Sequence, residues 1–169
     1  MSQDISSFQS SVLFVQDTAG TYRPAQADEV LQAAQSLLMS RVRNTEIFTS
    51  PHAVKDFLRV RLARLEHEVF AVVHLDSQNR MIEYVEMFRG TVSQTSVYPR
   101  EIVKETLARN SAAVILVHNH PSGAAQPSRA DEALTQTLKA ALALVDVRVL
   151  DHLIVAGVDV LSFAEKGLL

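Results

Sequence analysis

The stretch that decides both the fold and the chemistry of this chain is Val117–Asp131, which reads VHNHPSGAAQPSRAD. It continues an apolar run, Ala112–Val117 (AAVILV), and short runs of aliphatic and β-branched residues are typical of buried strands. Side chains alternate across a strand with period two, so His118 and His120 are expected on one face at the strand end. Two imidazoles that point the same way can share one metal ion.

A third candidate ligand, Asp131, follows a loop that contains proline and glycine. The segment that starts at Ser128 carries apolar residues at helical spacing, namely Leu134, Leu138, Leu142 and Val145. Asp131 would then lie in the first turn of a helix, close to the strand end that the chain has just left. Two histidines and one carboxylate form a known catalytic zinc set, which keeps a fourth position for water.

The same residues also have a purely structural interpretation. Ser128 followed by Asp131 fits a helix N-cap, with the acidic residue completing a variant of the capping box. An H-x-H pair at a strand end can likewise be two surface groups. The joint pattern H-x-H-x7-S-x2-D after a buried strand is much more specific than either part, and it favours the metal site.

This joint pattern resembles the JAMM motif of the MPN+/JAB metallopeptidase family, and the residues around it resemble the RadC-like branch of that family. The resemblance spans Pro51 to the C-terminus. Besides the motif it rests on four runs, which are Glu86–Thr91 (EMFRGT), Pro99–Ile102 (PREI), Val145–Val155 (VDVRVLDHLIV) and Ser162–Leu169 (SFAEKGLL). It implies that His118, His120 and Asp131 ligate zinc, that Glu86 is the general base, and that Ser128 helps to stabilise the developing oxyanion.

Three positions keep alternatives open. Glu86 shares a strand face with Tyr84, whereas Glu83 lies on the other face, and periodicity alone does not say which face meets the zinc; the E-x-x-x-G spacing to Gly90 favours Glu86 over a solvated strand residue. His152 is either a contact to the site or a hydrogen-bonded strand histidine, and the second interpretation is favoured. Tyr98 departs from the resemblance, because RadC-like proteins commonly carry histidine there.

The order of the remaining segments predicts an α/β fold. Helices are expected over Ala25–Val42 and from Pro51 and Pro99, and strands over Val12–Val15, Glu68–Asp76, Met81–Val92, Val147–Ala156 and Val158–Phe163. Alternation of strands and helices in the second half predicts a mixed β-sheet flanked by helices. JAMM/MPN domains are similar to cytidine deaminases in this respect. We expect an N-terminal extension at residues 1–48, with its helix packed on a RadC-like JAMM domain at residues 49–169; a lid or homodimer contact is the alternative for that helix.

Composition restricts the partners and the type of metal site. The chain has no cysteine, which excludes thiolate zinc sites and disulfides. Its net charge is -3, so binding to DNA is not favoured by charge. No apolar stretch is long enough for a membrane span and the N-terminus lacks the features of a secretory signal, so we expect a cytoplasmic protein.

We therefore expect a zinc-dependent hydrolase of the JAMM type that cleaves an amide, peptide or isopeptide bond in a peptide or protein substrate. The alternative is a RadC-like accessory protein in DNA repair or mobile-element biology that acts by binding. Fuller RadC proteins carry a helix-hairpin-helix region before this domain, and no G-x-G hairpin is visible between Met1 and Ser50. An H-x-H site of a large barrel enzyme is excluded because such barrels need about 250 residues.

Overall fold

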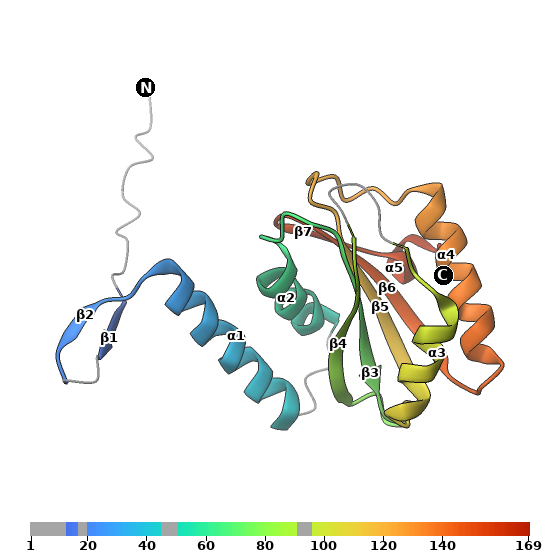
Figure 1. The fold of residues 1–169 in the computed structure, drawn as a ribbon, viewed down its shortest axis with the longest axis horizontal. Coiled ribbons are helices and arrows are strands. Elements are labelled where there is room, and N and C mark those ends of the chain that lie inside the picture. Colours follow the sequence, from blue (N-terminus) through green and yellow to red (C-terminus); the bar gives the residue numbers. More distant parts are fainter. Residues whose placement is uncertain (1–12, 17–19, 45–50, 91–95) are drawn as a thin grey trace.

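The computed structural model describes residues 13–16, 20–44, 51–90 and 96–169. Its elements are β1 (Phe14–Gln16), β2 (Tyr22–Pro24), α1 (Ala27–Asn44), α2 (Pro51–Leu62), β3 (Val69–Leu75), β4 (Met81–Arg89), α3 (Pro99–Ala108), β5 (Ala113–Asn119), α4 (Arg129–Ala143), β6 (Arg148–Ala156), β7 (Asp159–Ser162) and α5 (Phe163–Lys166). Figure 1 shows one twisted sheet with α2 on one face and α3 and α4 on the other.

The sheet has five strands in the order β4-β3-β5-β6-β7, and β5 lies at its centre. Strands β5 and β6 run parallel, whereas the other three neighbouring pairs are antiparallel. All residues of β3 and β5 are buried because helices cover both faces, which explains why these strands read as continuous apolar runs. The expected α/β fold with a mixed sheet between helices is confirmed.

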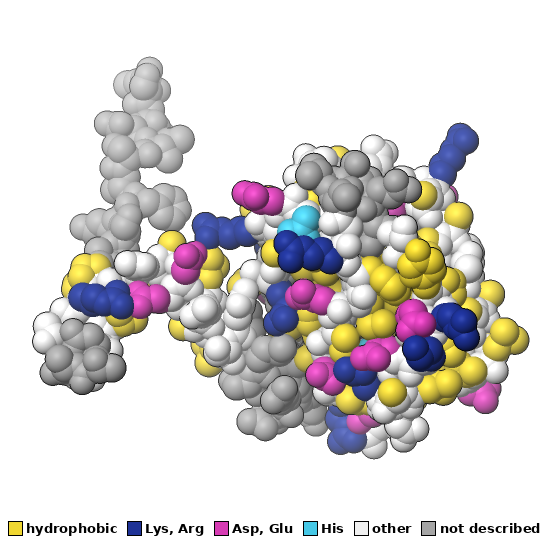
Figure 2. All heavy atoms as spheres, in the orientation of Figure 1, with side chains coloured by type: hydrophobic (Ala, Val, Ile, Leu, Met, Phe, Trp, Pro, Cys, Tyr) yellow, Lys and Arg dark blue, Asp and Glu magenta, His cyan; other side chains and the backbone are white. Residues whose placement is uncertain are grey.

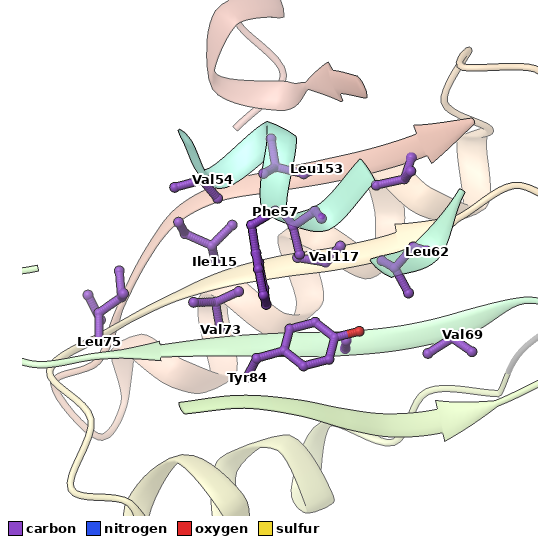
Figure 3. Close-up of a cluster of buried hydrophobic side chains, with 14 residues drawn as sticks. Val54, Phe57, Leu62, Val69, Val73, Leu75, Tyr84, Ile115, Val117 and Leu153 are labelled. Atoms are coloured by element: carbon purple, nitrogen blue, oxygen red, sulfur yellow. The ribbon is translucent and has the colours of Figure 1, made fainter. Parts of the chain in front are cut away.

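Two hydrophobic cores fill the spaces between the layers. Helix α2 packs Val54, Phe57, Leu58 and Leu62 onto one face of the sheet. Figure 3 shows Phe57 of α2 against Tyr84 of β4. Their ring centroids are 5.8 Å apart and their ring planes meet at 82°. On the other face, Ile102 of α3 and Leu138 and Leu142 of α4 cover Phe70 and Leu116, together with the neighbouring apolar residues of the same strands. The central strands β3 and β5 are therefore closed from water on both sides.

Local sequence signals explain several element ends. Asp76 closes the β3–β4 hairpin, since its Oδ1 accepts hydrogen bonds from the backbone N–H groups of Gln78 and Arg80. Asn79 in this turn has a positive φ of 60°, which asparagine tolerates better than most residues. Pro99 opens α3, as expected from its fixed φ. The short helix α5 was not expected; Ser162 caps it by accepting a hydrogen bond from Glu165 N.

The N-terminal hairpin β1–β2 and helix α1 lie beyond α2, to one side of the sheet (Figure 1). Helix α1 contacts the sheet domain through Gln35, whose Nε2 donates to the carbonyl of Val60 at 3.5 Å. The expected boundary between residues 48 and 49 lies outside the described residues.

Charges of both signs are mixed on the surface in Figure 2, where Lys and Arg side chains alternate with Asp and Glu around apolar patches. Several pair directly, for example Lys55 with Glu165 and Arg80 with Asp76, both at 2.7 Å. In the part of the chain that the structure describes, no helix is both long and apolar enough to cross a bilayer.

We expect Phe57→Ala to lower the free energy of unfolding by about 3–5 kcal/mol, because the substitution leaves a cavity between α2 and the sheet. Leu144→Ala is the control, since Leu144 is 87% exposed and its truncation should change stability by less than about 0.5 kcal/mol. Urea unfolding followed by circular dichroism measures both. Equal losses for the two variants would contradict this account of the core.

Candidate metal centre

The candidate metal ligands meet where the central strand ends and α4 begins. His118 is the penultimate residue of β5 and is 2% exposed. His120 continues the strand pairing for one more bond, with its backbone N–H donating to Val155 O of β6 at 2.9 Å. Asp131 lies in the first turn of α4. One ligand atom from each of the three lies within 4.8 Å of the others, so the group can hold a metal ion.

The distances within this cluster fit a tetrahedral ion. His118 Nε2 lies 2.9 Å from His120 Nε2 and 3.3 Å from Asp131 Oδ1. Bonds of about 2.0–2.1 Å to a tetrahedral zinc ion would place ligand atoms roughly 3.4 Å apart. Small shifts of the side chains would therefore bring all three ligand atoms to bonding distance of one ion.

Hydrogen bonding fixes which nitrogen His120 turns to the cluster. Its Nδ1 lies 2.7 Å from the carbonyl oxygen of Ala124, which can only accept a hydrogen bond, so Nδ1 carries a hydrogen. In a neutral ring the other nitrogen, Nε2, then has a free lone pair. This lone pair points towards His118 and Asp131, as a metal ligand requires.

The electrostatics of the cluster are those of a cation site. Burial lowers the pKa of His118 to about 4, so this ring is neutral at physiological pH. The carboxylate of Asp131, whose Oδ2 lies 3.7 Å from His120 Nε2, raises the pKa of His120. Partial burial alone would raise the pKa of Asp131, but the nearby imidazole of His120 and the hydrogen bonds from Ser128 outweigh it and hold that pKa well below its usual range. The carboxylate is therefore ionised, and it favours a positive charge beside it.

Ser128 orients the carboxylate of Asp131. Its backbone N–H and its hydroxyl both donate to Asp131 Oδ2 at 2.7 Å, and its Oγ accepts from Asp131 N at 3.1 Å. These bonds form a complete capping box, so the structural interpretation of Ser128 and Asp131 is confirmed. They leave Oδ1 of Asp131 facing His118. The role of Ser128 towards an oxyanion stays a prediction.

The structure does not bring Glu86 to the histidines. Glu86 pairs with Ala71, which belongs to the core under α2, and its Oε1 lies 3.4 Å from both Arg61 Nε and Tyr84 Oη. His118 instead pairs with Phe70, which lies in the core under α3 and α4. Glu86 and the histidines therefore occupy opposite faces of the sheet. Its role as general base remains a prediction without support from this geometry.

An irregularity in β4 changes the face of the sheet on which Glu86 lies relative to Phe88. The register between β3 and β4 shifts at Met87, so that Phe88 pairs with Phe70 while Glu86 pairs with the next residue, Ala71. Glu86 and Phe88 consequently lie on opposite faces, although a regular strand would place them on the same one. Glu83 is also remote, because it contacts Arg109 at 3.0 Å and pairs with His74 near the far end of β3.

Asn119, between the two histidines, ties the end of β5 to the segment before β3. Its Oδ1 accepts from Val69 N at 2.8 Å, and its Nδ2 donates to His67 O at 3.0 Å. These two bonds hold the residues on either side of Glu68. The side chain of Asn119 is 2% exposed, so the bonds are protected from competition with water.

Glu68 lies between the two residues that Asn119 binds, and it is the acidic residue that these hydrogen bonds bring to the cluster. Phe70 lies opposite His118, and β3 and β5 are antiparallel, so the position two residues before Phe70 lies opposite the position two residues after His118. That is the position of His120, and the charge of Glu68 contributes to raising the pKa of His120. Sequence reasoning missed Glu68, because the sequence shows that this residue precedes a buried strand but not which strand lies opposite it.

The structure also shows the surroundings of His152 and Tyr98, the two other positions that the sequence left open. His152 of β6 is fully buried, and its Nε2 lies 2.9 Å from Nδ1 of His118, so it contacts a candidate ligand directly. Burial lowers the pKa of His152 well below its ordinary value. Tyr98 precedes α3 without a side-chain capping bond, is 60% exposed, and places its ring 5.9 Å from that of Phe88.

Comparisons with known proteins agree with this architecture. Residues 48–168 match the family model described as RadC-like JAB domain. A UPF0758 protein of Methylibium petroleiphilum is 61% identical over 150 residues, which is 89% of this chain and 68% of that protein. UPF0758 proteins of Leptothrix cholodnii and Aromatoleum aromaticum are 57% and 59% identical, each over 89% of this chain and over 68% and 67% of their own lengths. This chain belongs to the RadC-like JAB domain family.

Proposed function

We propose that this chain is a zinc-dependent hydrolase that cleaves an amide, peptide or isopeptide bond. The observation that carries the proposal is the convergence of His118 Nε2, His120 Nε2 and Asp131 Oδ1 on one point. Two histidines and a carboxylate are a ligand set of catalytic zinc sites, in which three protein ligands leave a position open for water or substrate. Membership of the RadC-like JAB domain family is compatible with such an activity.

A zinc ion held here would polarise the carbonyl of the scissile bond and make a water molecule acidic enough to attack it near neutral pH. His118, His120 and Asp131 would hold the ion, and the hydrogen bonds from Ser128 would keep the carboxylate of Asp131 in one orientation. Ser128 is also our candidate for a contact to the developing oxyanion, with its hydroxyl exchanging Asp131 for the substrate.

We assign the role of general base to Glu68. Hydrolysis of an amide requires a carboxylate that takes a proton from the attacking water and passes it to the leaving amine. Glu68 is half-buried. The hydrogen bonds of Asn119 to Val69 and His67 hold the residues on either side of Glu68 beside the strand end that carries the histidines. Its influence on the pKa of His120 supports its proximity. Glu86, on the opposite face, is paired with Arg61 instead.

The chain should bind one zinc ion, and changing both His118 and His120 to alanine should abolish binding. Below the pKa of His120, which the neighbouring Asp131 raises, this ring carries a proton that the metal must displace. The apparent affinity should therefore fall by about tenfold for each pH unit below the pKa of His120, as expected for one displaced proton. Calorimetric titration with zinc in buffers of different ionisation enthalpy measures both affinity and proton release.

His52→Ala is the control for this zinc titration, since His52 is a surface histidine whose side chain is 83% exposed and pairs with Asp56. Its zinc content should match that of the unmodified chain. Equal zinc in the double alanine variant and the unmodified chain would refute the assigned ligands.

Glu68→Gln should keep the zinc ion but lower hydrolysis by roughly 100-fold or more, the usual scale of general-base catalysis. The assay is a panel of fluorogenic peptide amides together with an isopeptide-linked lysine substrate, each run with and without a chelator. Zinc content is measured on the same preparations.

Glu86→Gln and Glu83→Gln are matched controls, because both remove a strand carboxylate without approaching the histidines. Both should keep full activity. Loss of activity in Glu86→Gln with retention in Glu68→Gln would reverse our assignment, whereas loss of zinc in Glu68→Gln would make this residue a ligand rather than a base.

A further inference from the structure

Behind His118, on the side away from the candidate metal position, a chain of buried hydrogen bonds crosses from β5 to α4. Nδ1 of His118 lies 2.9 Å from Nε2 of His152, and Nδ1 of His152 lies 2.6 Å from Oγ1 of Thr135. Thr135 Oγ1 in turn donates to the backbone carbonyl of Asp131 at 2.6 Å. The side chains of His152 and Thr135 are fully buried, and His118 is 2% exposed.

The carbonyl of Asp131, at the end of this series of hydrogen bonds, determines which atom donates in each of them. The carbonyl oxygen of Asp131 has no hydrogen, so the hydroxyl hydrogen of Thr135 must lie between the two oxygens. Oγ1 of Thr135 therefore has to accept from Nδ1 of His152. A neutral imidazole has one donor and one acceptor nitrogen, which makes Nε2 of His152 an acceptor.

The same reasoning extends to His118. Since Nε2 of His152 accepts, the hydrogen between the two rings belongs to Nδ1 of His118. Nε2 of His118 is then left with a free lone pair, and this is the atom that lies 3.3 Å from Asp131 Oδ1 and 2.9 Å from His120 Nε2. Asp131 thus acts at both ends, with its carboxylate at the candidate metal position and its carbonyl as the anchor of the chain.

We propose that His152 and Thr135 are positioning residues that lock His118 in the tautomer with its hydrogen on Nδ1, so that its Nε2 lone pair is directed at the metal position. This inference rests on the proposed metal site. Partners of this kind, which bond to the second nitrogen of a ligating histidine, fix its orientation and commonly change metal affinity by about 10- to 100-fold. Sequence reasoning had favoured a purely structural role for His152.

The first test needs no metal. In the chain labelled with 15N-histidine, long-range proton–nitrogen correlation spectra distinguish the two tautomers of each neutral ring. We expect His118 and His152 to carry their hydrogen on Nδ1 in the metal-free chain, and His118 to lose this single tautomer in His152→Phe. A hydrogen on Nε2 of His118 in the unmodified metal-free chain would overturn the proposal.

The second test measures zinc affinity by competition with a chromophoric chelator. We expect His152→Phe to weaken zinc binding by about 10- to 100-fold and Thr135→Val by roughly 10-fold. His152→Gln should restore affinity to within about threefold of the unmodified chain, because an amide again offers an acceptor to His118 and a donor to Thr135. The absorption spectrum of the cobalt-substituted chain should change in His152→Phe and not in His152→Gln.

Matched controls separate positioning from packing. His74 is a fully buried strand histidine bonded to Ser111, and Thr106 is a fully buried helix threonine whose Oγ1 has no hydrogen-bond partner among the described residues. His74→Phe and Thr106→Val should therefore leave the zinc affinity within about threefold, with thermal unfolding monitored for every variant. Thr135→Val keeps the side-chain shape, so it tests the proposal even if His152→Phe fails to fold.

The outcomes distinguish this inference from the proposed function. An unmodified chain that binds no zinc would refute the proposed hydrolase, while the tautomer spectra would still decide the hydrogen-bond chain. Zinc binding that is normal in the unmodified chain and unchanged in both His152→Phe and Thr135→Val would refute the positioning role alone. Equal weakening in His74→Phe would assign the effect to packing and would overturn the proposal.

Discussion

Two backbone carbonyls, those of Ala124 and Asp131, govern the histidine cluster, because a carbonyl oxygen can accept a hydrogen bond but cannot give one. The bond to Ala124 O puts the hydrogen of His120 on Nδ1. The bond from Thr135 to Asp131 O does the same for His118 through His152. Both rings therefore turn a lone pair to the carboxylate, and the cluster has an arrangement that a cation stabilises.

The fold and the three candidate ligands were predictable because they depend on short-range sequence patterns. Strand β5 and the first turn of α4 are short-range patterns, and the joint pattern H-x-H-x7-S-x2-D links them across the loop. Glu68 was not predictable, because its place depends on the register of β3 against β5 and on the bonds of Asn119. The expectation for Glu86 came from the resemblance and from the spacing to Gly90, and neither reveals the register shift at Met87.

Burial makes the cluster rigid, and it also makes the loss of any one of its hydrogen bonds costly in free energy. His118 and His152 are surrounded by apolar rings, with Phe70 stacked 6.2 Å from His118 at an angle of 12°. A buried polar ring that loses a partner costs about 1–3 kcal/mol, so each bond in the chain depends on the next. The core under α3 and α4 thus holds both the apolar contacts that stabilise the sheet and the polar contacts that orient the candidate ligands.

Helix α5 has a consequence for the dielectric around these rings. Its first residue, Phe163, is fully buried with its ring centroid 4.8 Å from that of His152, and Asp151 ties the helix down by accepting hydrogen bonds from Ser162 Oγ at 2.6 Å and Ala164 N at 3.0 Å. The phenyl ring keeps solvent from the far side of His152. Hydrogen bonds are stronger in such a dry, low-dielectric environment, so this single turn of helix helps to set the strength of the bonds behind His118.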